Sequence, residues 1–287
     1  MLSRRGALGI LAVTILRGQD KKLNMFGDAE AYDRFMGRWS HLVAPLLVDF
    51  TGLPGTGRVL DVGSGTGSLA FVIAERNKQS RVLGIDPSKE YVAYANSRNP
   101  LPDRATFQVC DAQHLRLSKA TFAASLSLLV FNFIPDPNKA LREVRRVTKA
   151  GCPISAAVWD YGEGMRMLRV FWDAAVSVDA RAERLDEKHM PLCRAGDLSH
   201  LWKRGGLENV QEQPLDITMR FESFADYGDP FLLGQGPAGS YVRSIDHDRL
   251  PVLRDAVKRG LSISGENVPF ALPARVWAVR GIVPSRF

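Results

Sequence analysis

The sequence predicts an α/β fold in which helices cover both faces of a mainly parallel sheet. From about residue 58, short β-branched runs alternate with segments of helical pattern, and this alternation is typical of parallel strands joined by helices. A glycine-rich turn at residues 63–67 follows the first expected strand, as in nucleotide-binding α/β sheets. The chain has 287 residues, 45% of them hydrophobic, which is enough to bury one large core.

The strands and helices can be placed in order along the chain. We expect strands at residues 58–62, 81–85, 106–110, 124–130, 153–159, 210–221 and 275–282. Helices are expected at residues 68–76, 89–98, 138–149, 165–178, 196–203 and 249–259. Ser88 precedes the second helix, where its hydroxyl can accept a free backbone N–H. Leu141, Val144 and Val147 share one face of the third helix, and Gly151 follows its end.

The chain shows one domain with an insertion. No linker or run of like charge separates its halves, so we expect a single domain over residues 25–287 with a core at residues 58–160. Residues 222–268 are rich in turns and aromatic side chains. They would form an insertion of helices and loops that acts as a lid over the substrate.

The first 24 residues differ from the rest in charge. They hold five basic side chains against Asp20, a net charge of +4 out of +7 for the chain. The triplet SRR before the apolar run Ala7–Leu16 has the form of an export signal. However, no small-x-small cleavage site follows, and the run is too short to cross a bilayer. We expect a disordered extension, or a stretch upstream of a true start at Met25, on a cytoplasmic protein without stable membrane insertion.

Charge and cysteine content exclude several kinds of partner. The remaining net charge of +3 is spread over the rest of the chain. The helix expected at 138–149 carries Glu143 among its basic residues, as is typical of a solvated face. We therefore expect no nucleic-acid partner. Three widely spaced cysteines, Cys110, Cys152 and Cys193, indicate free structural thiols. No metal-type spacing of Cys or His occurs, so no metal is expected, and nothing indicates the oligomeric state.

The glycine turn itself indicates the type of ligand. Its spacing is G-x-G-x-G, with Ser68 where a dinucleotide-binding turn has its third glycine. Asp61 lies two residues before Gly63, and its carboxylate would repel a pyrophosphate at the helix N-terminus. It would suit a ligand with an ammonium group, such as the methionine end of S-adenosylmethionine. An NAD(P)-dependent oxidoreductase, or a turn that binds nothing, remains as an alternative.

Two further carboxylates end the next strands. Asp86 ends the second strand and can accept hydrogen bonds from two ribose hydroxyls, which any nucleoside would offer. Asp111 ends the third strand, where it could accept from the adenine amine or simply form a turn. With Asp61, these residues lie at the carboxyl ends of three successive strands, where open α/β sheets bind ligands.

The sequence resembles a known enzyme family over residues 58–160. The resemblance lies in VLDVGSGTGSLA, GIDPS, CDAQHL and SLLVFNFIPDPNKALREVRRVTKAG. These stretches are similar to the cofactor-binding core of class I (Rossmann-like) S-adenosylmethionine-dependent methyltransferases, in the type 11 group that includes quinone-biosynthesis enzymes. The flanking stretches AYDRFMGRWS, VWDYGEGMRMLRVFWDAA and DPFLLGQGPAGSYV resemble bacterial members. The resemblance implies a Rossmann-like seven-stranded sheet and methyl transfer to a small-molecule acceptor, with S-adenosylhomocysteine as product.

The resemblance also implies roles for individual residues. Those expected to hold S-adenosylmethionine are Asp61 at the amino group, Gly63, Ser64, Gly65, Thr66 and Gly67 at the methionine moiety, Asp86 and Pro87 at the ribose, Asp111 and Ala112 at the adenine, and the backbone from Ser127 to Val130. A segment before the core would fold over the cofactor, with Arg38 on its carboxylate and Tyr32 and Trp39 as a lid.

The chain departs from its relatives near the fourth strand. Phe122-Ala123 stands where many relatives have an acidic residue, and Asn132-Phe133 stands where many have paired histidines. Asn132 to Pro135 also lacks the Asn/Asp-Pro-Pro-aromatic pattern of enzymes that methylate nucleobase amines. This difference argues against a nucleic-acid amine as acceptor.

The acceptor site is less well defined. A general base is needed only for a weakly acidic hydroxyl or a protonated amine, and the candidates are Asp160, Tyr161, His114 and Tyr227. The aromatic residues of the lid would line a pocket for an apolar or planar molecule, or else form plain core. They are Phe221, Phe224, Tyr227, Phe231 and Tyr241, with glycines 228, 234, 236 and 239 as hinges. A non-catalytic S-adenosylmethionine-binding protein remains an alternative.

Overall fold

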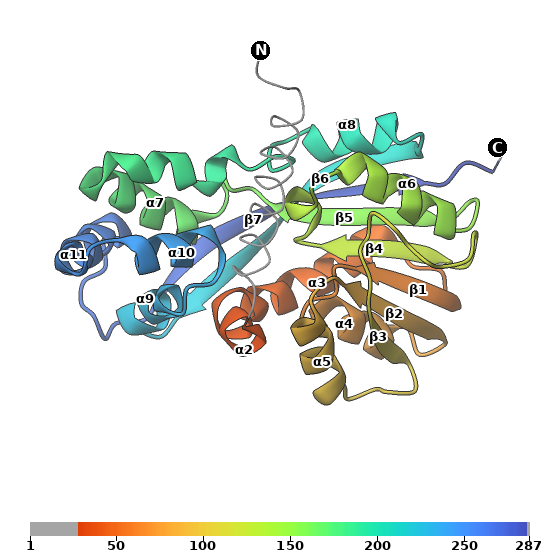
Figure 1. Cartoon of the computed structure of the whole chain (residues 1–287), viewed down its shortest axis with the longest axis horizontal. Helices are drawn as coiled ribbons and strands as arrows, with labels where there is room; N and C mark the ends of the chain where they lie inside the picture. The colour runs from red at the N-terminus through yellow and green to blue at the C-terminus, as the bar shows by residue number, and fades with distance from the viewer. Residues whose placement is uncertain (1–27, 286–287) are drawn as a thin grey trace, which may run out of the picture.

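The computed structural model describes residues 28–285, so the extension predicted at residues 1–24 lies outside the described part of the chain. A seven-stranded sheet runs through the molecule in the order β3-β2-β1-β4-β5-β7-β6 (Figure 1). Its strands are β1 (Gly57–Val62), β2 (Ser80–Asp86), β3 (Ala105–Val109), β4 (Ala124–Leu128), β5 (Pro153–Trp159), β6 (Glu208–Phe221) and β7 (Phe270–Ile282). Neighbours among β1 to β5 pair in parallel, whereas β7 runs antiparallel to β5 and β6. This topology confirms the predicted Rossmann-like fold.

Helices and short turns connect the strands. Before the sheet come α2 (Ala29–Tyr32), η1 (Asp33–Gly37) and α3 (Arg38–Thr51). Between the parallel strands lie α4 (Ser68–Arg76), α5 (Lys89–Ser97), η2 (Phe131–Phe133) and α6 (Pro137–Val147). After β5 follow α7 (Arg166–Val178), η3 (Ala180–Leu185), η4 (Glu187–His189) and α8 (Asp197–Arg204). The late insertion consists of α9 (Phe224–Leu232), α10 (Gly236–Ser244), η5 (His247–Arg249) and α11 (Leu250–Leu261).

The local signals in the sequence account for the parallel half of the sheet. Every residue of β4 and β5 is buried, as expected for strands covered on both faces. The Ser88 hydroxyl accepts the Tyr91 N–H at 3.2 Å, which confirms the predicted cap of α5. The strand expected at 124–130 ends earlier, at Leu128, because Leu129 has a φ of 64°. That left-handed conformation takes the backbone out of the strand.

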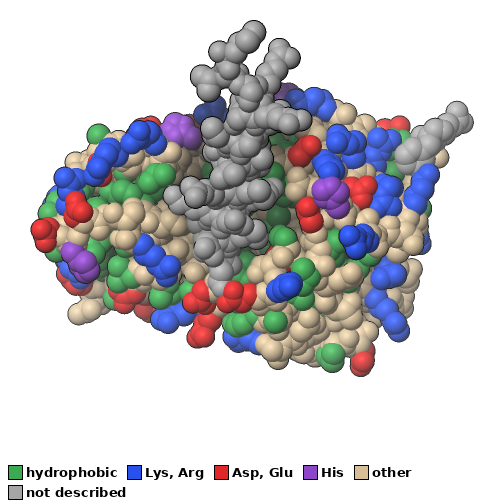
Figure 2. Space-filling view, viewed as in Figure 1, with side chains coloured by type: hydrophobic (Ala, Val, Ile, Leu, Met, Phe, Trp, Pro, Cys, Tyr) green, Lys and Arg blue, Asp and Glu red, His purple; other side chains and the backbone are tan. Residues whose placement is uncertain are grey.

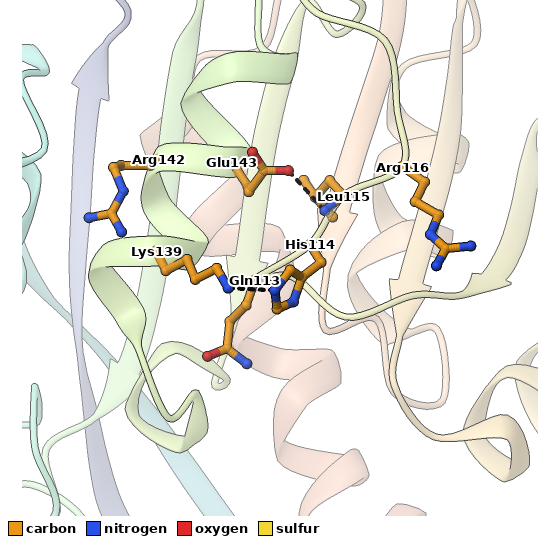
Figure 3. A pocket seen from close by; sticks show the side chains of 7 residues that line it. All are labelled: Gln113, His114, Leu115, Arg116, Lys139, Arg142 and Glu143. Atoms are coloured by element: carbon orange, nitrogen blue, oxygen red, sulfur yellow. Dashed lines mark hydrogen bonds between the residues drawn. The ribbon is translucent and has the colours of Figure 1, made fainter.

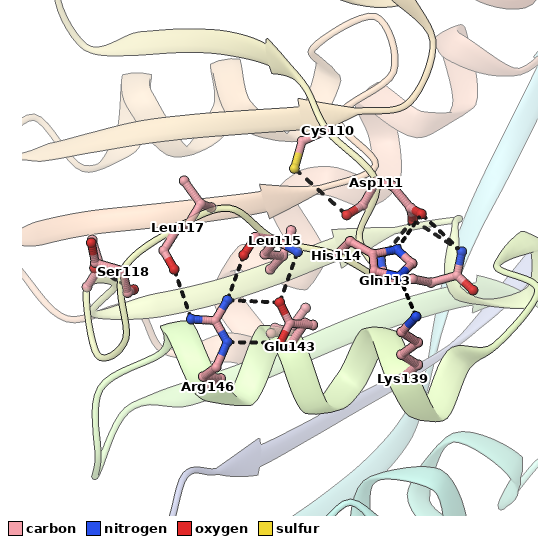
Figure 4. A network of polar contacts seen from close by, with 12 residues as sticks. Cys110, Asp111, Gln113, His114, Leu115, Leu117, Ser118, Lys139, Glu143 and Arg146 are labelled. Atoms are coloured by element: carbon pink, nitrogen blue, oxygen red, sulfur yellow. Dashed lines mark hydrogen bonds and ion pairs between the residues drawn. The ribbon is translucent and has the colours of Figure 1, made fainter.

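The basic face of α6 is less solvated than the sequence suggested. Arg146 binds Glu143 and the carbonyl oxygens of Leu115 and Leu117 (Figure 4). These bonds fasten α6 to the segment after β3. Over the face shown in Figure 2, lysine and arginine side chains are interspersed with acidic ones, and no single basic patch dominates.

The aromatic residues of the insertion form a hydrophobic core. Phe221, Phe224, Tyr227, Phe231 and Tyr241 are each at most 5% exposed. The ring of Phe231 stacks on Phe171 of α7 with centroids 4.5 Å apart. The expectation that these side chains line an acceptor pocket is therefore not supported, and the alternative of plain core describes them.

The predicted hinge glycines also fall into two groups. Gly228 and Gly239 lie inside α9 and α10, where they do not act as hinges. Gly234 and Gly236 have φ values of 75° and 66° and form the turn between these helices. These values require glycine for the conformation of the turn, and the predicted hinge role of the turn stays a prediction.

Within residues 28–285, no helix is both long and apolar enough to cross a bilayer. Within the same residues, no group of three or more His, Cys, Asp or Glu side chains could hold a metal ion. The three cysteines are free thiols.

Candidate cofactor site

The glycine turn after β1 is held against the end of β2. The N–H groups of Gly63 and Ser64 both donate to the Ile85 carbonyl, at 2.8 and 2.9 Å. Gly63 has a φ of 75°, and a Cβ atom there would lie 2.5 Å from the side chain of Val130. Both its conformation and its space therefore require glycine. The turn leads directly into the N-terminus of α4, where backbone N–H groups are free.

Asp61 is a buried carboxylate without a partner. It is 0% exposed, and neither of its carboxylate oxygens has a hydrogen-bond partner among the described residues. Burial, together with the nearby charge of Asp86, raises the pKa of Asp61 to about 8, while the Ala70 backbone N–H acts in the opposite direction from outside hydrogen-bonding geometry. Buried polar groups are nearly always hydrogen-bonded in folded proteins. An unpartnered carboxylate next to a glycine turn therefore indicates a site for a donor such as an ammonium group.

Asp86 joins this turn to α5. Its Oδ2 atom accepts the Gly65 N–H at 3.0 Å, and its Oδ1 atom accepts the Ser88 N–H at 2.9 Å. Burial raises the pKa of Asp86 to about 6, while these two backbone hydrogen bonds act in the opposite direction. A carboxylate offers about four acceptor sites, so Asp86 keeps acceptor capacity for ligand hydroxyls. Pro87 follows it at the start of the turn into α5.

Tyr32 and Tyr91 lie beside Asp86. The two rings are 5.4 Å apart, and the hydroxyl of Tyr91 is buried with no partner found within residues 28–285. Burial raises the pKa of Tyr32 to about 12, and the charge of Asp86 adds to this rise. Unpartnered polar atoms therefore gather around the glycine turn, since the hydroxyl of Ser64 is also without a partner there.

Asp33 and Tyr91 were not identified from the sequence. The Thr66 hydroxyl donates to Asp33 Oδ1 at 3.3 Å, so η1 packs directly on the glycine turn. Asp33 lies within the stretch AYDRFMGRWS that resembles relatives. This resemblance was the only indication in the sequence that Asp33 lies near the glycine turn. Tyr91 gave no signal beyond its place on the expected helix after Ser88.

Arg38 and Trp39 have other roles than the ones expected. The Arg38 guanidinium binds both carboxylate oxygens of Asp226 in α9, at 2.6 and 3.1 Å, and also the Arg220 carbonyl. Trp39 is buried against Phe221, with ring centroids 5.1 Å apart. The structure therefore uses Arg38 to hold the insertion to α3, and it places Trp39 in the core. Of the three predicted lid residues, only Tyr32 lies beside the predicted cofactor residues.

Asp111 is committed to a local turn. Its side chain is 47% exposed, accepts the Gln113 N–H at 2.8 Å and contacts His114 Nδ1 at 3.2 Å (Figure 4). Partial burial would raise its pKa, but these hydrogen bonds outweigh it and the pKa is lowered. The turn explains these contacts by itself, so the adenine role of Asp111 and its neighbour Ala112 stays a prediction.

His114 lies at an open pocket of about 430 Å³ on the outer side of this turn (Figure 3). The pocket is lined by Gln113, His114, Leu115, Arg116, Lys139, Arg142 and Glu143. His114 Nε2 contacts the Lys139 ammonium, and the His114 side chain is 65% exposed. This position on the surface makes His114 a poor candidate for the general base.

The other candidates for the general base differ in their position and in their hydrogen bonds. The Tyr227 hydroxyl donates to the Met167 carbonyl at 2.8 Å within the aromatic core, which removes Tyr227 from the candidates. Asp160 and Tyr161 directly follow β5, at the same edge of the sheet as Asp61. Asp160 Oδ1 accepts the Glu163 N–H at 3.1 Å. The Ser127 hydroxyl donates to the Val62 carbonyl at 2.8 Å and joins β4 to β1, and the predicted backbone contact of Ser127 with the cofactor stays a prediction.

The sheet order, the glycine turn and the buried carboxylates at its edge together define a Rossmann-like fold with a candidate ligand site at the carboxyl ends of its parallel strands. Residues 60–154 match the family described as a methyltransferase domain. The chain is 33% identical over 114 residues to the ubiquinone/menaquinone biosynthesis C-methyltransferase UbiE of Desulfotalea psychrophila, covering 40% of this chain and 44% of that one. It is 28% identical over 148 residues to the malonyl-[acyl-carrier protein] O-methyltransferase of Geobacter sulfurreducens, and the match covers 48% of this chain and 55% of that one. The chain thus spans about half the length of these relatives.

Solved structures share the fold. Phosphoethanolamine N-methyltransferase 2 of Haemonchus contortus, in complex with S-adenosyl-L-methionine, has a TM-score of 0.57 at 17% identity, covering 90% of this chain and 57% of that one. The YcgJ protein of Bacillus subtilis has a TM-score of 0.57 at 18% identity, and the match covers 85% of this chain and 99% of that one. Residues 60–154 are thus similar to class I S-adenosylmethionine-dependent methyltransferases, and the described structure has the same fold as these solved proteins.

Proposed function

We propose that this protein transfers a methyl group from S-adenosylmethionine to a small-molecule acceptor. The observation that carries the proposal is Asp61, a fully buried carboxylate whose two oxygens have no partner in the described structure. An ammonium group beside the glycine turn would satisfy its ionised form, whereas a pyrophosphate offers no donor to pair with it. Because this cofactor is supplied by the cytosol, we propose that the reaction takes place there.

The described residues fit the parts of such a cofactor. Asp61 would pair with its amino group, and the residues of the glycine turn would lie against the methionine moiety. Asp86 would accept from the ribose hydroxyls, with Tyr32 beside it. Asp111 and Ala112 would lie at the adenine. Hydrogen bonds between charged and neutral groups make a net contribution of about 1.5–3 kcal/mol each.

S-adenosylmethionine, when bound, supplies a methyl group already activated by a sulfonium. The protein therefore has mainly to hold the acceptor in line with the methyl–sulfur bond. Positioning of this kind can lower a reaction barrier by about 7–11 kcal/mol in favourable cases. The residues that follow β4 and β5 lie at the correct edge of the sheet for this task.

The proposal is tested by binding and turnover. We expect isothermal titration to give micromolar dissociation constants for S-adenosylmethionine and S-adenosylhomocysteine, and no binding of NADH at the same concentrations. Release of S-adenosylhomocysteine with an acceptor panel would separate an enzyme from a non-catalytic binder. Absence of any heat or thermal shift with millimolar S-adenosylhomocysteine would contradict the proposal.

A further inference from the structure

The open pocket on the outer side of the turn after β3 is lined almost entirely by polar and charged side chains (Figure 3). Its volume of about 430 Å³ lies in the range of sites that bind small molecules. One wall is α6, which contributes Lys139, Arg142 and Glu143, and the other wall is the segment of residues 113–116. None of these residues is among those predicted to hold the cofactor, so the pocket offers a second place for a ligand.

Hydrogen bonds hold the two walls together. The Glu143 carboxylate in α6 accepts the backbone N–H of Leu115 at 2.9 Å. The side-chain carbonyl oxygen of Gln113 accepts the Asp136 N–H at 3.1 Å, which fastens the same segment to the residue that caps α6. The shape of the pocket is therefore fixed before a ligand arrives, and a preformed site spends less free energy on ordering when it binds.

Glu143 is the one acidic side chain among the lining residues, and its charge is already compensated. Its Oε1 and Oε2 atoms accept hydrogen bonds from Arg146 at 2.9 and 2.8 Å (Figure 4). Arg146 itself does not line the pocket. Because this bidentate pair commits both carboxylate oxygens, Glu143 leaves the positive charges of the pocket without an internal counterion.

Those positive charges belong to Arg116, Lys139 and Arg142. Within residues 28–285, no ion pair joins any of the three to a carboxylate. Lys139 and Arg142 are three residues apart on α6, a spacing that places their side chains next to each other on the helix surface. Arg116 comes from the opposite wall. An anion in the pocket would therefore meet cations on both sides.

His114 orients the Lys139 ammonium without removing its charge. The ammonium donates to His114 Nε2, because it has donors and no acceptor. The proton of the neutral imidazole is then on Nδ1, which lies 3.2 Å from Asp111 Oδ2. An ammonium group has three donors, so two of them stay available to a ligand.

We propose that this pocket binds a phosphoryl group, with Lys139 and Arg142 donating to its oxygens. A phosphate monoester carries a charge of about −1.5 to −2 at pH 7 and three strong acceptor oxygens, which suits this set of cations better than a single carboxylate does. Arginine binds phosphate through paired N–H groups and lysine as a point charge. The inference goes beyond the proposed methyl transfer and does not depend on it.

The size of the pocket favours an organic phosphate over the free ion. A volume of about 430 Å³ leaves room beside the phosphoryl group for the rest of a small molecule. Arg116, on the far wall, would lie along that part of the ligand. Inorganic phosphate shares the same recognition chemistry, so both are probed.

Titration calorimetry of the full chain tests the proposal at low ionic strength, because salt screens exposed charges. The probes are glycerol 3-phosphate, inorganic phosphate and, as the uncharged control, glycerol. We expect at least one phosphate probe to bind with a dissociation constant of about 1 mM or lower, and glycerol not to bind. Tighter binding of the ester identifies an organic phosphate as the ligand, whereas equal or tighter binding of inorganic phosphate identifies the free ion.

Variants assign the binding to the pocket. The double variant Lys139→Gln with Arg142→Gln should weaken phosphate binding by about tenfold or more, because both direct contacts are lost. The matched control is Lys78→Gln with Arg81→Gln, which removes the same charges at the same spacing from exposed positions outside the pocket. It should bind within about twofold of wild type. Thermal melts establish that both double variants fold, and Arg116→Gln, on the other wall, should by itself weaken the binding by about threefold.

Three results would overturn the inference. They are absence of binding by both phosphate probes at about 10 mM, unchanged affinity in the pocket double variant, and an equal loss of affinity in the two double variants. The last result would show attraction by the overall charge of the protein and not by this pocket. Because the titration contains no cofactor, its outcome is independent of the proposed function.

Discussion

At the scale of single residues, Asp86 has a structural role in the described structure and a binding role in the proposed function. Its two backbone hydrogen bonds fix the glycine turn to the start of α5. Two roles are compatible with this position, a ribose ligand and a residue that merely caps the helix. The structure shows the capping contact to Ser88 and, in addition, a contact to Gly65 that ties the carboxylate to the turn.

Replacing Asp86 distinguishes these roles. We expect Asp86→Ala to weaken S-adenosylhomocysteine binding by about ten- to a hundredfold, because two charge-assisted hydrogen bonds to the ribose are lost. A loss of about 1 kcal/mol in stability should accompany it, since two N–H groups lose their acceptor. Titration calorimetry and thermal melts measure both. Asp103→Ala, at an exposed position, serves as control, and an Asp86→Ala affinity within twofold of wild type would refute the ribose assignment.

At the scale of elements, the contact between α3 and α9 determines how the insertion is placed. Arg38 and Asp226 are 188 residues apart in the chain and form a two-bonded ion pair, and the Arg38 guanidinium also lies 4.3 Å from the Trp39 ring centroid. About a third of each side chain is exposed, so solvent screens the pair and its contribution is small. Its main consequence is geometric, because it orients Arg38 toward the insertion.

The variants Arg38→Gln and Asp226→Asn test this role. Each should lower the melting temperature by about 1–3 °C, as expected for an ion pair worth up to about 1 kcal/mol. Affinity for S-adenosylhomocysteine should stay within about twofold. The control is Asp229→Asn, which removes an exposed charge from the same helix. If Arg38→Gln alone reduces the affinity by tenfold or more, Arg38 does contact the cofactor.

At the scale of the whole molecule, the sequence predicted the parallel half better than the rest. Strand–helix alternation and the glycine turn are local patterns, and they located β1 to β5 and the carboxylates Asp61 and Asp86. The partner of Arg38 could not be predicted, because no periodicity relates residues so far apart. The sequence could not show whether the aromatic side chains of the insertion line a pocket or form a core, since composition does not show what they pack against.

The central claim is that Asp61 recognises the amino group of the cofactor. Because its pKa in the unliganded protein is raised to about 8, most molecules carry a proton on Asp61 at pH 7. Pairing with an ammonium group requires the ionised carboxylate, so binding must release that proton. Affinity should therefore strengthen as the pH rises toward 8, and weaken by up to about tenfold per pH unit below it.

The most direct measurement is titration calorimetry of S-adenosylhomocysteine at pH 7 in buffers of different ionisation enthalpy. We predict release of about one proton by the wild-type protein and, for Asp61→Asn, much weaker binding in which that proton release is lost. Binding that neither releases protons nor changes with pH between about 6 and about 8, or an Asp61→Asn variant with wild-type affinity, would contradict the account.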